Sequence, residues 1–180
     1  MRLFQAGLLG VFFAFGTASA AEFDNLYPLF SHKSLVKICV SPLSDETGKE
    51  KKADPADLKK KLEEALAARK SIRFQVVPKK EEAEIVVMAR ITEMVWMEKD
   101  PVDMFMGIGS AVMDAVIQEH YARMEALFTV QDAKTNQVLW EEKLKATVTH
   151  PTMSKAESVP MVDEDMVKVF LRECFGKRRR

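Results

Sequence analysis

The sequence predicts an α+β domain, with a mixed sheet of about five strands and helices packed mainly on one face, in the order β-α-β-β-α-β-β-α. Two short apolar runs flank an amphipathic segment, an order typical of parallel strands joined by a right-handed crossover helix. Two later segments alternate apolar and polar side chains around the turn "DAKTNQ", as antiparallel hairpin strands do. A chain of 180 residues that is 47% hydrophobic is long enough to form one such core.

The first half of the domain begins with "SLVKICVSPL", a short apolar run that ends at Pro42 and predicts a central strand. "DPADLKKKLEEALAARKS" predicts a helix with Asp54 as N-cap, Pro55 at the first helical position and apolar side chains at helical spacing. "SIRFQVVP" alternates and stops at Pro78, which predicts a second strand parallel to the first. "EIVVMARITEMVWME" then predicts a long strand, apolar on both faces at its start.

The second half begins with the methionine-rich segment, predicted as an apolar helix, and continues with the hairpin. The apolar face of the hairpin is formed by Met124, Ala126, Phe128 and Val130 on one strand and by Val138, Trp140, Leu144, Ala146 and Val148 on the other. Glu142 interrupts this face. A loop, "HPTMSKAESVP", is expected next, followed by a helix near "DEDMVKVFLRECFG" that starts with acidic residues and stops at Gly176. Its expected buried residues are Met166, Val167, Phe170, Leu171 and Cys174.

The amino terminus has the pattern of an export signal. Arg2 precedes an apolar run that ends with Ala18-Ser19-Ala20, the small-x-small pattern after which signal peptidase cleaves. No cysteine stands at the cleavage point, so we expect a periplasmic or secreted protein without a lipid anchor. The expected organisation is a signal peptide at residues 1–20, an amino-terminal arm at 21–34, an α/β core domain at 35–150, and a linker with a carboxy-terminal helix and basic tail at 151–180.

Charge and motifs exclude several functional classes. The chain has 27 basic and 27 acidic residues, so its net charge gives no reason to expect a nucleic-acid partner. No segment combines a nucleophile or general base with a residue that would orient it, and C-x-x-C is absent. We therefore expect a protein that is not an enzyme, with no catalytic residue, no cofactor and no metal site.

The two cysteines allow two interpretations. Cys39 lies in a predicted strand and Cys174 near the end of a predicted helix. In an oxidising compartment they could pair if the helix packed over that strand. The alternative is that both are small buried apolar side chains that never meet, because a disulfide requires a Cα separation that the sequence does not specify.

The segment from Met104 to Ile117 is nearly free of charge and is the most unusual part of the chain. Its 14 residues would rise only about 21 Å as a helix, too short for the roughly 30 Å of membrane hydrocarbon. Small residues recur every four positions, at Gly107, Ala111 and Ala115, and allow close backbone approach. The segment is either a helix buried against its own sheet or an exposed helix that binds a partner or a second copy of the chain. The candidate interaction residues are Met104, Phe105, Met106, Ile108 and Met113.

Methionine content raises one alternative function. Seven of the eleven methionines lie between Met88 and Met124, and thioethers are soft ligands that select Cu(I). A periplasmic Cu(I)-binding protein could use the cluster Met94, Met97, Met104 and Met106. However, Met94 and Met97 would point to opposite faces of a strand, and methionines at such spacing are more often core residues.

Four segments resemble a group of exported bacterial proteins, many of them lipoproteins known only as domains of unknown function. The segments are "VKICVSPLSDETG", "AEIVVMARITEM", "GIGSA" and "ALFTVQDAKTNQVLWEEKL", within residues 35–148. More distantly, the pattern is similar to the globular domain of the curli secretion channel subunit and to the amino-terminal domain of the Tol translocation protein. The resemblance implies a non-catalytic periplasmic module that binds other envelope proteins, or itself, and assists envelope assembly or transport. This chain lacks the lipidated cysteine of the lipoprotein members.

Overall fold

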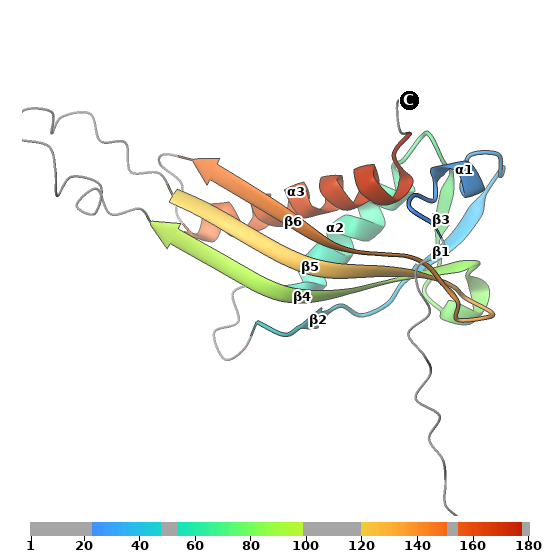
Figure 1. Cartoon of the computed structure of the whole chain (residues 1–180), viewed down its shortest axis with the longest axis horizontal. Coiled ribbons are helices and arrows are strands. Elements are labelled where there is room, and N and C mark those ends of the chain that lie inside the picture. The colour runs from blue at the N-terminus through green and yellow to red at the C-terminus, as the bar shows by residue number, and fades with distance from the viewer. Residues whose placement is uncertain (1–22, 48–53, 99–119, 151–154, 178–180) are drawn as a thin grey trace, which may run out of the picture.

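The computed structural model of the chain describes residues 23–47, 54–98, 120–150 and 155–177 (Figure 1). Its elements, in chain order, are α1 (Tyr27–Phe30), β1 (Val36–Val40), β2 (Ser44–Asp45), α2 (Pro55–Ala67), β3 (Phe74–Val76), the 3-10 helix η1 (Lys80–Glu82), β4 (Ile85–Glu98), β5 (His120–Asp132), β6 (Val138–His150) and α3 (Lys155–Phe175). They form one mixed sheet with the long helices α2 and α3 packed on it, so the predicted α+β class is confirmed. No helix in these segments is both long enough and apolar enough to cross a membrane.

The sheet has six strands where about five were expected, because the two-residue strand β2 pairs with β4 beside the main order β3-β1-β4-β5-β6. β1 pairs parallel with β3 and with β4, and the chain passes from β1 to β3 through α2, as predicted from the strand–helix–strand order. β4, β5 and β6 are antiparallel neighbours. The sheet therefore has a short parallel side and a long antiparallel side, and the latter extends past β1 in Figure 1.

Helix α2 begins where the sequence predicts, because Asp54 caps it. Asp54 Oδ1 accepts hydrogen bonds from the backbone N–H groups of Ala56, at 2.9 Å, and Asp57, at 3.3 Å. These bonds satisfy two of the N–H groups that the first turn of a helix leaves without an internal partner. The buried face of α2 consists of Leu58, Leu62 and Leu66.

The β5–β6 hairpin has the predicted alternation from Trp140 to Val148. For Val138 the prediction was wrong, because a bulge at Leu139 places Val138 opposite Gln131 on the outer face and buries Leu139 instead. Val130 lies opposite Trp140, whose side chain is only 1% exposed. Glu142 lies opposite the buried Phe128 but is itself exposed. Because β6 is an edge strand, the Glu142 side chain can reach water past the border of the sheet.

Strand β4 contains a bulge after Ile91. Ile91 and Glu93 pair with consecutive residues of β5, which leaves Thr92 as the extra residue. Thr92 Oγ1 donates a hydrogen bond of 3.2 Å to the carbonyl oxygen of Glu125, within β5. As a result Ile91 faces the core before the bulge and Met94 faces it afterwards.

Helix α3 begins earlier than predicted. It spans Lys155–Phe175, so the loop expected over "HPTMSKAESVP" is largely the first part of this helix, and that prediction was wrong. Pro160 lies inside the helix, where it lacks the N–H for one helical hydrogen bond. Ser158 and Val162, on either side of it, are both buried. The burial of these two neighbours stabilises the helix through Pro160. The helix ends before Gly176, as predicted.

Aromatic side chains join α3 to the sheet. The rings of Phe128 and Phe170 stack with their centroids 4.7 Å apart, and Trp140 meets Phe170 edge-on at 5.8 Å. At the end of the helix, Phe175 meets Phe74 of β3 edge-on at 5.0 Å. These contacts fix the carboxy-terminal half of α3 across the sheet, from β5 and β6 on one side to β3 on the other.

The cysteines do not pair. Cys39 belongs to a small cluster with Val77, Ala83 and Val86, on the face of the sheet turned away from α2 and α3. Cys174 lies on α3, inside the main core. Both thiols are buried and free, so of the two interpretations above, that of two buried apolar side chains is confirmed.

Candidate functional site

The predicted interaction residues fall outside the part of the chain that the structure describes. They are Met104, Phe105, Met106, Ile108 and Met113, and the small residues Gly107, Ala111 and Ala115 lie in the same stretch. The structure does describe the two strands that flank this stretch. Glu98, at the end of β4, pairs with His120, at the start of β5. Glu98 and His120, the residues on either side of this stretch, are therefore one strand spacing apart, at the tip of an antiparallel pair.

The strands below this tip are well packed. On the core side, Met94 and Met124 lie opposite each other and are both buried. On the open face, ion pairs link neighbouring strands: Arg123 with Glu93, and Lys143 with Glu125 at 2.6 Å. The open face of β4–β6 is thus occupied by charges that compensate one another.

The structure argues against Met94 as one of the copper ligands considered above. Met94 is a core residue, packed against the inner face of the sheet, and is not available to bind a metal at the surface. Met104 and Met106 lie outside the described residues. Within the described segments, no three His, Cys, Asp or Glu side chains are close enough together to hold a metal ion. Cu(I) binding stays a prediction from the sequence alone.

A shallow cavity of about 280 Å³ lies beside α1 and the β5–β6 turn. Its acidic groups already have partners. Glu84 pairs with Lys33 at 2.6 Å, and Asp132 Oδ1 accepts the backbone N–H groups of Lys134 and Thr135 at 2.9 and 2.8 Å. These bonds close the β5–β6 turn, so the charges at this cavity serve the local structure.

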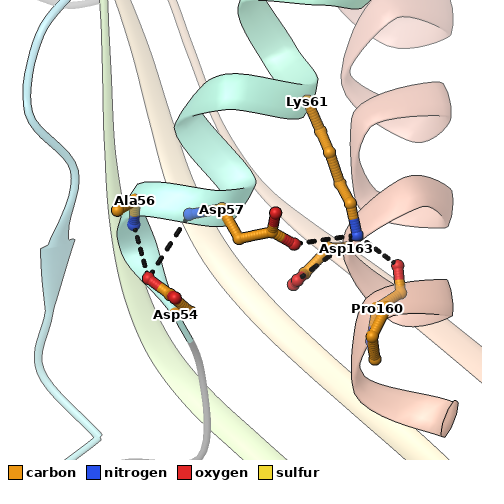
Figure 2. Close-up of polar contacts among 6 residues, drawn as sticks. All are labelled: Asp54, Ala56, Asp57, Lys61, Pro160 and Asp163. Carbon is orange, nitrogen blue, oxygen red and sulfur yellow. Dashed lines mark hydrogen bonds and ion pairs between the residues drawn. The ribbon is translucent and has the colours of Figure 1, made fainter.

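The most unusual polar group in the described residues is a carboxylate between α2 and α3, shown in Figure 2. The Asp163 side chain is only 1% exposed, on the face of α3 that meets α2. Its Oδ2 lies 3.9 Å from Lys61 Nζ, beyond hydrogen-bonding distance, and its Oδ1 is buried without a hydrogen bond. Lys61 Nζ is shared: it lies 3.0 Å from Asp57 Oδ2 and donates a hydrogen bond of 2.8 Å to the carbonyl oxygen of Pro160.

This environment changes the acidity of Asp163. Burial raises the pKa of its carboxyl group to about 7, against an ordinary value of 3.8, and the nearby Lys61 opposes the rise. The negative charges of Asp57, Asp54 and Glu164 raise it further. Asp163 therefore changes its protonation state near neutral pH, which is unusual for a carboxyl group and characteristic of functional positions.

The burial of Asp163 has a signal in the sequence. The acidic residues at 163–165 were expected to begin the last helix, where an acid is favourable and exposed. The buried positions of the helix, Met166, Phe170 and Cys174, continue the helical spacing back to residue 163. Asp163 is thus the one carboxylate of the three that falls on the apolar stripe.

Comparison with known proteins gives a match of fold only. No protein-family model matches the chain, and no curated protein matches its sequence. Among solved structures, protein XCC0632 from Xanthomonas campestris, described with the family model DUF330, has a TM-score of 0.51 with 7% identity, over 85% of this chain and 92% of that one. The PelC dodecamer from Paraburkholderia phytofirmans has a TM-score of 0.47 with 15% identity, over 89% of this chain and 96% of that one. Lipoprotein GNA1162 from Neisseria meningitidis has a TM-score of 0.45 with 10% identity, over 71% of this chain and 92% of that one.

The similarity to XCC0632 establishes a shared fold over most of both chains, and at this identity it establishes nothing about activity. The named structures are neither the curli secretion channel subunit nor the Tol translocation protein, so the resemblance to those two stays a prediction. The chain belongs structurally with α+β proteins that place two helices across a mixed, partly antiparallel sheet.

Proposed function

We propose that this chain is a non-catalytic protein-interaction module of the bacterial envelope that assists assembly or transport, and that residues 99–119 carry the interaction. The observation that supports this most directly is the pairing of Glu98 with His120. The two attachment points of an apolar, methionine-rich stretch therefore lie together at the tip of a strand pair. Methionine-rich apolar stretches are typical of surfaces that adapt to a binding partner.

Two further features support the proposal. The export signal at residues 1–20 would deliver the protein to the envelope. In addition, the charged side chains on the open face of β4–β6 are engaged with one another, as in the pair of Lys143 with Glu125, so this face offers no assembled set of acid, base and nucleophile.

Site-specific photo-crosslinking in living cells would test the proposal. A photoreactive phenylalanine analogue replaces Phe105 in one variant and Lys145, an exposed residue of β6, in a control variant. We expect an adduct with an envelope protein, or with a second copy of the chain, from position 105 and none from position 145. Equal adducts from both positions, or none from position 105, would contradict the proposal. Intact mass of the native protein tests the location, because export predicts a mature chain that begins at Ala21.

The variant Ala111→Leu separates the two roles considered for the apolar segment. If the segment packs against its own sheet, the larger side chain should clash and lower the free energy of unfolding by roughly 1–3 kcal/mol. If it binds a partner, stability should stay unchanged while association fails. Thermal unfolding and sedimentation of the one variant distinguish these outcomes.

A further inference from the structure

The contact between α2 and α3 contains too little positive charge for its acidic groups. Lys61 is the cation nearest to Asp163, and its Nζ lies closer to Asp57 Oδ2, at 3.0 Å, and to the Pro160 carbonyl, at 2.8 Å. When ionised, Asp163 has only the longer 3.9 Å approach of the same ammonium group. Figure 2 shows Lys61 reaching from α2 to these three oxygen-bearing groups.

The other charged groups around Asp163 make its ionisation harder. α2 contributes Asp54 and Asp57 along with Lys61, and α3 itself contributes Glu164. The strands packed against α3 are β5 and β6. Along those two strands, the positions on the face toward α3 hold apolar residues except Asp132 at the turn, Glu142, and the paired His120 and His150 at the other end. The charge of Glu142 acts on Cys174, at the opposite end of the helix.

The two halves of α3 are held by different means. The carboxy-terminal half is fixed by the aromatic contacts of Phe170 and Phe175, and Arg69, just after α2, donates a hydrogen bond of 2.6 Å to the Phe175 carbonyl. The amino-terminal half contains Pro160, which removes one helical hydrogen bond, and it meets α2 at Asp163 and Lys61. A change in the charge of Asp163 therefore acts on the less strongly held half.

We propose that Asp163 and Lys61 form a pH-responsive latch between α2 and α3: with Asp163 neutral the first half of α3 stays packed on α2, and with Asp163 ionised this half loosens. The physical reason is the desolvation of a buried carboxylate, which only a close and uncommitted cation can offset. This inference does not depend on the proposed function, because it concerns the packing of two described helices.

The direction of the pH effect follows from the acidity of the group. Burial raises the pKa of Asp163 to about 7 in the folded protein, while the exposed carboxyl of a loosened helix has an ordinary value near 3.8. The closed state therefore binds more protons between these values, and its stability relative to the open state falls as the pH rises through this window. Above pH 7 both states are ionised and the loss levels off. The latch is closed in acid and weakest above neutrality.

Hydrogen–deuterium exchange measures the opening of α3 directly. Protection factors, corrected for the intrinsic pH dependence of exchange, are compared at pH 5.5 and pH 8 for the amides of residues 158–164 and of residues 169–175. If the opening that allows exchange also exposes Asp163 fully, protection of residues 158–164 should fall by roughly 10-fold to 30-fold, as calculated from the two pKa values. Protection of the second group should change much less.

Three variants make the test specific. Asp163→Asn keeps the size of the side chain and removes its titration, so the pH dependence of the first group should disappear. Asp57→Asn frees Lys61 to approach Asp163, so the midpoint of the transition should move to lower pH. Glu164→Gln, an exposed neighbour on the same helix, should keep the transition with at most a small shift. Unchanged protection of the wild-type protein between pH 5.5 and 8 would overturn the proposal. An equal fall in Asp163→Asn would overturn it as well, and if that variant does not fold, an unmoved midpoint in Asp57→Asn would do so.

Discussion

Trp140 is the side chain whose removal best tests the register of the long hairpin. It is 1% exposed, lies opposite Val130, and meets the ring of Phe170 edge-on with centroids 5.8 Å apart. A large aromatic side chain buries about 150–250 Å², and at roughly 25 cal/mol per Å² this burial is worth about 4–6 kcal/mol. Because alanine retains part of that area, Trp140→Ala should lower the free energy of unfolding by roughly 3–5 kcal/mol.

Urea denaturation followed by circular dichroism would measure this loss. Lys145→Ala, an exposed residue on the opposite face of β6, is the matched control and should change stability by less than about 0.5 kcal/mol. Trp140→Phe should lose less than the alanine variant. A double-mutant cycle with Phe170→Ala should give a coupling of roughly 0.5–1.5 kcal/mol for the ring pair. A loss below about 1 kcal/mol in Trp140→Ala would refute the reasoning, because it would mean that the ring faces water and that the register is displaced by one residue.

Three further predictions concern single groups. Asp54→Ala should lower stability by about 1 kcal/mol because α2 loses the two N-cap hydrogen bonds, whereas Asp54→Asn should retain most of it; a loss equal in both variants would argue against capping. Gly176→Ala should cost about 1 kcal/mol or more in chemical denaturation, since a Cβ there would lie 2.1 Å from the Arg172 carbonyl oxygen, and Lys177→Ala should be neutral. Burial raises the pKa of both Cys39 and Cys174, so a thiol reagent at pH 8 should label neither in the native protein and both in denaturant; no labelling after denaturation would indicate a disulfide.

Elements whose signals are local were predictable from the sequence. Asp54 and Pro55 indicate the start of α2 because capping depends only on adjacent residues. The alternation around "DAKTNQ" predicts the inner face of the β5–β6 hairpin from Trp140 onward because a strand has a period of two residues, but it misses the bulge that buries Leu139 in place of Val138. Trp140 was placed correctly on this basis.

Features that depend on packing between distant segments were not predictable. The first part of α3 was predicted as a loop because Pro160 disfavours a helix locally, and only the burial of Ser158 and Val162 outweighs that preference. The burial of Asp163 depends on α2, about a hundred residues earlier in the chain, supplying Lys61 beside it. The separation of Cys39 from Cys174 likewise depends on which face of β1 the helices cover.

The bulge at Thr92 has a consequence for how this chain can change in evolution. Before the bulge the odd-numbered residues of β4, such as Ile91, face the core, and after it the even-numbered ones, such as Met94, do so. The bulge therefore decides which side chains of the rest of the strand, up to Glu98, point inward. Removing Thr92 would restore regular alternation, because Ile91, Glu93 and Met94 already pair with the consecutive residues Ala126, Glu125 and Met124. We therefore expect deletion of Thr92 to be tolerated, whereas deletion of Ala89, before the bulge, should be far more damaging because Arg90 would take its place in the core.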